Sequence, residues 1–169
     1  MLLSTTEMGD GVEIRAAVVT ASDSRSIEED LSGQRLAELL VEYGARVSEH
    51  VVVADDLEEI AEKLRTYADR QDIDLIVTSG GTGLGPRDNT PEATLSVIER
   101  EAPGIVEAMR LLTIRNTPKA MLSRGVAGIR NGTLIINLPG SPRGVEECFA
   151  VLAPVLRHAV AVVKGNTEH

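Results

Sequence analysis

Short apolar segments alternate with amphipathic segments along most of this chain, and this alternation constrains the fold more than any other feature. Continuous apolar runs at residues 14–21 and 74–79 are typical of strands that are buried on both faces of a sheet. A β-branched run at residues 47–54, between these two, predicts another strand. Residues 31–43 and 57–68 carry apolar side chains at helical spacing. The alternation predicts an α/β fold of three layers, with a mostly parallel sheet and helices on both faces.

The second half of the chain continues this pattern. Thr90 followed by proline is typical of a helix start, and a further helix is predicted over residues 105–112. Residues 126–130 and 133–138 are predicted as two strands, because Asn131-Gly132 between them favours a tight hairpin turn. The sheet is therefore expected to contain one antiparallel hairpin strand.

Size and composition limit the possible functions. The 169 residues suffice for one domain, and we predict a flexible tail at 1–11 followed by a single domain at 12–169. A formal net charge of −9 and 2% aromatic residues argue against a nucleic-acid partner, which needs basic patches or stacking rings. The single cysteine, Cys148, excludes an internal disulfide framework. Since no apolar run reaches the roughly 18–20 residues of a membrane span and no signal-like segment opens the chain, we expect a cytoplasmic protein without a membrane partner.

Polar or glycine-rich segments follow each predicted parallel strand. Ligands of such sheets bind at the carboxyl ends of the strands, so these segments are expected to share one rim and to form the functional site. Ser141 also opens the last helix, either as a plain cap or as part of a second anion site. The rim segments carry Ser22 and Asp23 after the first strand, Asp55 after the second, residues 80–88 after the third, and Pro139, Gly140 and Ser141 after the last.

The segment from Gly80 to Asp88 is the strongest single feature of the rim. Four glycines within six positions allow the backbone to approach a ligand closely and to present several N–H groups. The segment leads to the predicted helix start at Thr90, which favours anions. These properties predict phosphate binding, although a tight strand-to-helix turn would use the same glycines. The segment is not a Walker A loop, because no Gly-Lys-Ser/Thr follows it.

Two carboxylates, Asp55 and Asp88, end neighbouring rim segments. They would repel a phosphate substrate unless a divalent cation lay between them, and Mg²⁺ is held by one or two carboxylates together with substrate phosphates. We therefore take both as candidate catalytic residues and Mg²⁺ ligands; the alternative is that Asp88 caps the next helix and Asp55 is solvated beside the cap Asp56. Arg87 and Arg124 can hold phosphates in a bidentate manner, or can remain solvated on the surface.

Taken together, these motifs resemble the molybdopterin adenylyltransferases of molybdenum cofactor biosynthesis, the MogA/MoaB family, which is similar to the G domain of gephyrin. The resemblance covers residues 14–165, nearly the whole chain. It rests on residues 78–83, 87–94, 123–124, 127–128 and 138–142, and on an Asp-x-Ser-Gly motif at 30–33. The candidate substrate- and nucleotide-binding residues are Ser22, Asp23, Gly80, Gly81, Thr82, Gly83, Arg87, Thr90, Ser123, Arg124, Pro139, Gly140 and Ser141.

The resemblance implies a reaction in which the terminal phosphate of molybdopterin attacks the α-phosphate of Mg-ATP and pyrophosphate leaves. The adenylyl-molybdopterin product would pass to a molybdenum insertase of the MoeA type. The two acidic residues of the family fall on Asp55 and Asp88, the pair already identified from the rim. The family is typically trimeric, so a homotrimer is expected.

Two other functions stay open at this point. The first is a catalytically silent MoaB-type protein that binds and carries molybdopterin. The loop at residues 22–32 is shorter than in many catalytic members, as in the MoaB-type branch, whereas the presence of Asp88 favours activity. The second is an insertase-type or CinA-like relative, and the length of the chain argues against it, because those proteins carry additional domains.

Overall fold

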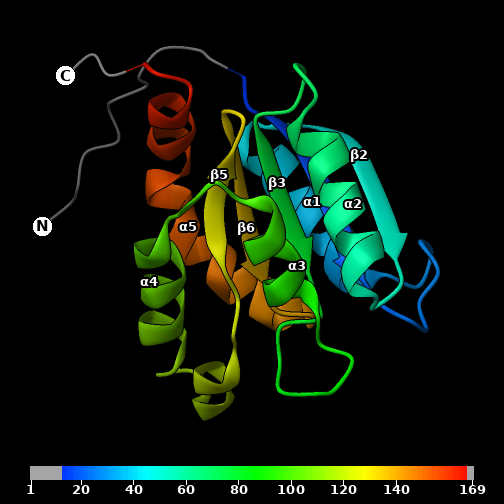
Figure 1. Ribbon diagram of the computed structural model, residues 1–169. Coiled ribbons are helices and arrows are strands. Elements are labelled where there is room, and N and C mark those ends of the chain that lie inside the picture. Colours follow the sequence, from blue (N-terminus) through cyan, green and yellow to red (C-terminus); the bar gives the residue numbers. More distant parts are fainter. Residues whose placement is uncertain (1–12, 167–169) are drawn as a thin grey trace, which may run out of the picture.

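The computed structural model describes residues 13–166, so the predicted tail at 1–11 lies outside the described residues (Figure 1). None of the helices in this range has the length and apolar character that a membrane crossing requires. In chain order the elements are β1 (Arg15–Ala21), α1 (Leu31–Tyr43), β2 (Arg46–Val53), α2 (Leu57–Ala68), β3 (Leu75–Ser79), α3 (Thr90–Val97), β4 (Arg100–Glu101), α4 (Pro103–Thr113), the 3-10 helix η1 (Pro118–Leu122), β5 (Ala127–Arg130), β6 (Thr133–Leu138) and α5 (Pro142–Val163).

The strands form one six-stranded sheet in the order β2-β1-β3-β6-β5-β4. Strand β1 pairs in parallel with β2 and β3, and β3 pairs in parallel with β6. Strand β5 is antiparallel to both of its neighbours, so it alone among the described strands runs in the opposite direction. Helices α1, α4 and α5 cover one face of the sheet, and α2 and α3 cover the other (Figure 1). The predicted three-layer α/β fold with one antiparallel hairpin strand is confirmed.

Alternate residues of the central strands enter two separate cores. In β3, Leu75 and Val77 belong to the core beneath α1, α4 and α5, whereas Ile76 belongs to the core beneath α2 and α3. In β6, Leu134 belongs to the core beneath α1, α4 and α5, and Ile135 belongs to the core beneath α2 and α3. Because both faces of these strands are covered, every position is buried, which explains why the strands appear in the sequence as continuous apolar runs.

Two local features differ from the sequence prediction. Helix α4 begins at Pro103, two residues before the predicted start at 105, because proline fits the first turn of a helix, where its missing N–H has no helical partner to lose. The short elements β4 and η1 were not predicted. Neither is long enough to show a hydrophobic period, so the sequence carries no periodic signal for them.

A buried carboxylate joins the end of α5 to the amino end of β3. The side chain of Asp74 is 4% exposed, and its Oδ1 lies 2.8 Å from Arg15 Nη2 and 2.6 Å from Lys164 Nζ. Its Oδ2 accepts hydrogen bonds from the backbone N and the Nε of Arg15. Burial alone would raise the pKa of the Asp74 carboxyl, but these donors outweigh burial and hold the pKa well below its usual range.

We expect Asp74→Asn to lower the free energy of unfolding at pH 7 by about 2 kcal/mol. The substitution removes the buried negative charge that Arg15 and Lys164 pair with, and the cost is moderate because both of these side chains are partly solvated. The depressed pKa means that this stabilisation is present above the unfolded pKa of about 3.9 and is lost as the pH falls toward the folded value. Urea unfolding at pH 7 and below pH 4 would measure both effects. Asp72→Asn, at a surface carboxylate paired with Arg70, is the control and should change stability little. The same pH dependence in the wild-type and Asp74→Asn proteins would contradict the assignment.

Candidate functional site

The order of the strands reverses between β1 and β3. The chain passes from β1 through α1 to β2 on one side, and returns through α2 to β3 on the other side. In open α/β sheets, a ligand binds at the carboxyl ends of the strands at such a reversal. The loops that follow β1, β2, β3 and β6 do meet at this rim, as the contacts below show.

The backbone at Gly80 lies against the ends of two other strands. Gly80 has a φ of +89°, and a methyl group there would lie 2.6 Å from the carbonyl oxygen of Ala21 at the end of β1. A methyl group at Gly140 would lie 3.1 Å from the Cα of Gly80. The N–H of Gly80 donates to the carbonyl of Leu138 at 3.2 Å. Glycine is therefore required by both conformation and space where β1, β3 and β6 end.

The next residues present unpaired backbone donors. Among residues 13–166, the N–H groups of Gly81, Thr82 and Gly83 make no hydrogen bond. Gly81 has a φ of +66°, and its α-carbon faces the hydroxyl of Thr90 and Oδ1 of Asp55. The Thr90 hydroxyl is itself buried and has no hydrogen-bond partner in the described chain. These polar groups form a cradle suited to an anion such as phosphate.

Asp23 and Asp55 are joined by two reciprocal hydrogen bonds, in which the carboxylate of each accepts from the backbone N–H of the other. The N–H of Asp23 donates to Oδ2 of Asp55, and the N–H of Asp55 donates to Oδ1 of Asp23, both at 3.0 Å. Arg87 forms a bidentate pair with Asp23, with Nε and Nη2 at 3.0 and 2.9 Å from the two oxygens. Burial, together with the nearby charges of Asp23 and Asp88, raises the pKa of Asp55 above its ordinary value. Negative charge is thus concentrated here, beside a cradle that favours anions.

Asp88 does not cap helix α3. The N-cap of α3 is Asn89, which makes no side-chain capping bond, whereas Oδ2 of Asp88 accepts a hydrogen bond from the N–H of Gly85 at 2.8 Å. Added methyl groups at Gly83 and Gly85 would lie 2.9 and 2.8 Å from this oxygen, so the carboxylate lies directly beneath the glycine-rich loop. Of the two alternatives for Asp88, the structure therefore excludes the helix cap.

The two carboxylates fit a divalent cation that arrives with its substrate. Asp55 and Asp88 each use Oδ2 to accept a backbone hydrogen bond, and within the described range Oδ1 of each accepts none. Nowhere in residues 13–166, this site included, do three or more histidine, cysteine or acidic side chains converge as a metal site. A complete ligand set from the protein is therefore absent from this range. Mg²⁺ needs no such set, because it commonly takes one or two carboxylates and completes its shell with phosphates and water.

Arg124 holds the glycine-rich loop. Its Nε donates to the carbonyl of Gly83 at 2.7 Å, its Nη2 donates to the carbonyl of Asp88 at 2.8 Å, and its Nη1 pairs with Glu92 on α3. From the sequence, Arg124 and Arg87 were expected either to hold phosphates or to remain solvated on the surface. In the structure both guanidinium groups bind the protein, and Arg124 fixes the shape of the loop.

A cavity of about 450 Å³ lies next to the loop, between α4, η1 and the start of α5. Val106, Met109 and the buried Cys148 give it an apolar wall, and burial raises the pKa of the Cys148 thiol to about 11. Of the residues predicted from sequence, it is lined by Gly81, Thr82, Gly83, Asp88, Ser123, Pro139, Gly140 and Ser141.

The remaining predicted residues lie outside this cavity, so the candidate site has two adjoining parts. The first part is the acidic cluster, formed by Asp23, Asp55 and Asp88. The second part is the cavity, which Asp88 also lines, and the segment 81–83 borders both parts. The wall of the cavity that α4 and η1 form, including Met109 and Lys119, was not predicted from the sequence, because these residues do not follow a strand of the sheet. The residues outside the cavity are Ser22, Asp23, Asp55, Gly80, Arg87, Thr90 and Arg124.

Known proteins share this architecture. Residues 17–158 match a family described as a probable molybdopterin binding domain. A molybdopterin adenylyltransferase of Helicobacter pylori is 43% identical over 157 residues, which cover 90% of this chain and 89% of that protein. The crystal structure of the molybdopterin biosynthesis enzyme MoaB from Thermus thermophilus is 46% identical, with a TM-score of 0.83, over 90% of this chain and 97% of that chain. The Mog protein of Mycobacterium ulcerans, at 40% identity and the same TM-score, aligns over 89% of this chain and 99% of its own. The chain therefore belongs to the molybdopterin binding domain family.

Proposed function

We propose that this protein is a molybdopterin adenylyltransferase, which transfers the AMP group of ATP to the terminal phosphate of molybdopterin and releases pyrophosphate. The observation that carries the proposal is the placement of Asp55 and Asp88 on either side of the backbone donors at Gly81–Gly83, each with one carboxylate oxygen that accepts no hydrogen bond from the described residues. The Helicobacter pylori relative that bears this name covers most of the chain, which supports the enzyme over a silent carrier of molybdopterin.

The reaction depends on positioning and on charge neutralisation. A phosphate oxygen of molybdopterin attacks the α-phosphorus of ATP, a new P–O–P bond forms, and the bond to pyrophosphate breaks as pyrophosphate takes the electron pair. No protein nucleophile is needed, since the substrate phosphate attacks directly. The N–H groups of Gly81–Gly83 would bind phosphate oxygens, and Arg124 would keep this loop in shape.

Asp55 and Asp88 would hold Mg²⁺ together with the substrate phosphates. When bound, the ion neutralises phosphate charge and relieves the repulsion that the acidic cluster would otherwise exert. The raised pKa of Asp55, caused by burial and by its acidic neighbours, fits a carboxylate whose charged form a bound cation would stabilise.

The proposal extends to the setting of the enzyme. Its product would pass to a molybdenum insertase of the MoeA type, and the protein would act in the cytoplasm as a homotrimer. Exposed apolar side chains near the cavity, such as Leu111 and Met121, support an association of subunits, because an interface would remove them from water.

Asp88→Asn tests the reaction directly. We expect the wild-type protein to release pyrophosphate from Mg-ATP only when molybdopterin is added, and the variant to release it at least about a hundredfold more slowly. The asparagine oxygen can still accept the hydrogen bond from Gly85, so the loop keeps its shape while the charge is lost. Pyrophosphate release is the measurement, and Glu58→Gln on the exposed face of α2 is the control. Full turnover by Asp88→Asn would contradict the proposal, and molybdopterin binding without any release by the wild type would support the silent carrier.

A further inference from the structure

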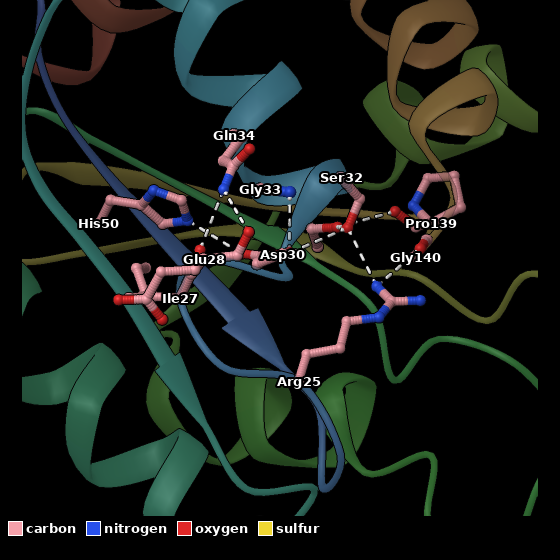
Figure 2. A network of polar contacts seen from close by, with 11 residues as sticks. Arg25, Ile27, Glu28, Asp30, Ser32, Gly33, Gln34, His50, Pro139 and Gly140 are labelled. Atoms are coloured by element: carbon pink, nitrogen blue, oxygen red, sulfur yellow. Dashed lines mark hydrogen bonds and ion pairs between the residues drawn. The ribbon is translucent and has the colours of Figure 1, made fainter.

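The hydroxyl of Ser32 lies at the centre of a buried polar network at the start of α1 (Figure 2). It donates to Oδ1 of Asp30 at 3.2 Å and accepts from Nη1 of Arg25 at 3.3 Å. The hydroxyl of Ser79, at the end of β3, lies 3.0 Å away. One side chain thus connects the loop after β1, the first turn of α1 and the end of β3.

The same network reaches the loop between β6 and α5. Nη1 of Arg25 also donates to the carbonyl of Gly140 at 3.2 Å, and Oγ of Ser79 lies 3.1 Å from the carbonyl of Pro139 (Figure 2). Because Ser79 has a single hydroxyl proton, it donates at any one time either to the hydroxyl of Ser32 or to the carbonyl of Pro139. No other hydrogen bond to these two carbonyls occurs among residues 13–166. The orientation of this loop therefore depends on two side chains.

Asp30 gives the network a fixed base. Its side chain is fully buried, accepts a hydrogen bond from the N–H of Gly33 at 3.0 Å and caps α1. Nε2 of His50 on β2 donates to Oδ2 of Asp30 at 2.9 Å. With both oxygens occupied, Asp30 cannot rotate without losing several buried hydrogen bonds, so the Ser32 hydroxyl is held in one position.

Arg25 and Ser32 act at a distance from the substrate cavity. Neither lines it, whereas Gly140 and Ser141 do, opposite Gly81 and Gly83. Gly140 also lies in backbone contact with Gly80, so a shift of one loop moves the other. The guanidinium of Arg25 therefore acts on the cavity directly through the Gly140 carbonyl that it binds, and indirectly through Ser32.

We propose that Arg25 and Ser32 are positioning residues that keep the β6–α5 loop in register with the glycine-rich loop, so that the two substrates are aligned across the cavity. The inference rests on the proposed adenylyl transfer. Misalignment of reacting groups by about 1 Å can reduce a rate by about a hundredfold even when binding is retained. The network should therefore govern turnover more than substrate affinity.

The test compares Arg25→Ala and Ser32→Ala with the wild-type protein. We expect kcat to fall by about tenfold to a hundredfold, with KM for ATP within about threefold. Arg25→Lys should recover part of kcat, because an ammonium group can still donate to one of the two acceptors. Arg65→Ala is the control, since Arg65 lies on α2 and, within the part of the chain that the structure describes, its side chain makes only a distant 4.0 Å pair with Glu58.

Hydrogen–deuterium exchange supplies a measurement that does not depend on activity. Exchange in peptides covering residues 80–85 and 139–144 should increase in both alanine variants and remain at the wild-type level in the control. The Ser32→Ala variant removes only a hydroxyl, so it keeps the test valid if Arg25→Ala fails to fold.

The outcomes separate this inference from the proposed function. Increased exchange with reduced kcat supports the inference. Unchanged exchange, or increased exchange with an unchanged kcat, overturns it. If the wild-type protein does not adenylylate molybdopterin but the variants still show increased exchange in both loops, the coupling of the loops stands and the proposed function fails.

Discussion

Asp55→Asn is expected to slow adenylyl transfer by about 10²–10³-fold while leaving the fold intact. The substitution removes a negative charge from the acidic cluster and replaces a carboxylate oxygen by an amide group; Oδ1 of Asp55 lies beside Gly81 and accepts no hydrogen bond within residues 13–166. The asparagine oxygen can still accept the hydrogen bond from the N–H of Asp23, so the β1 and β2 loops remain joined. Pyrophosphate release at saturating substrates, with thermal unfolding as a check of the fold, would measure the effect.

The adjacent residue offers a closely matched control. Asp56 carries the same charge one position later, and its Oδ1 accepts the hydrogen bond from the N–H of Glu59 that caps α2. Asparagine caps helices about as well as aspartate, so Asp56→Asn loses the charge but keeps the cap. It should retain nearly full turnover. Equal losses in the Asp55 and Asp56 variants would mean that general negative charge at this rim matters, and the specific role of Asp55 would be withdrawn.

Gly80→Ala should destabilise the fold strongly, because the added methyl group meets both a strained backbone and a steric overlap. The alanine would have to adopt a φ of +89° and would place its Cβ 2.6 Å from the Ala21 carbonyl oxygen. A positive φ costs an alanine about 1–2 kcal/mol, and overpacking adds about 1–3 kcal/mol. We expect a loss of about 3 kcal/mol in the free energy of unfolding, measured by urea titration, and a large loss of turnover as the loop shifts.

Gly132 separates conformational strain from steric overlap. It has a φ of +75° in the β5–β6 hairpin, but a methyl group there would meet nothing within 4 Å. Gly132→Ala should therefore cost only the conformational part, about 1 kcal/mol, and leave turnover unchanged. Similar stability losses at the two glycines would show that the close approach of β1 to Gly80 contributes little.

The sequence predicts the layers and the sheet because its central strands are covered on both faces. Complete burial of β3 produces an unbroken apolar run, and such runs alternating with amphipathic helices leave few other architectures. The hairpin is predictable for a different reason, since Asn131 and Gly132 both adopt the positive φ that this tight turn requires. Elements shorter than one period, such as β4 and η1, follow from tertiary contacts and escape prediction.

The location of the site is predictable, but the contacts of its side chains are not. A topological rule places the loops of parallel strands on one rim, and that rule is sufficient to bring Asp55 near Asp88. The direction of a long side chain depends on nearby acceptors that only the folded chain defines. Arg87 and Arg124 illustrate this. The sequence made both of them candidates for phosphate binding, but in the structure Arg87 binds Asp23 and Arg124 binds the carbonyl of Gly83, both far away in the chain.

The order of the strands also determines when the site can form during folding. Ala16 in β1 pairs with Leu75 in β3, and Leu75 pairs in turn with Leu134 in β6. Contacts between segments so far apart in the chain close large loops, which slows folding. The Gly80 backbone meets Gly140 only after β6 has joined the sheet, so a nascent chain must extend beyond β6 before the cavity can form. Premature termination before this strand would leave a polypeptide without the candidate site, whatever secondary structure it retained.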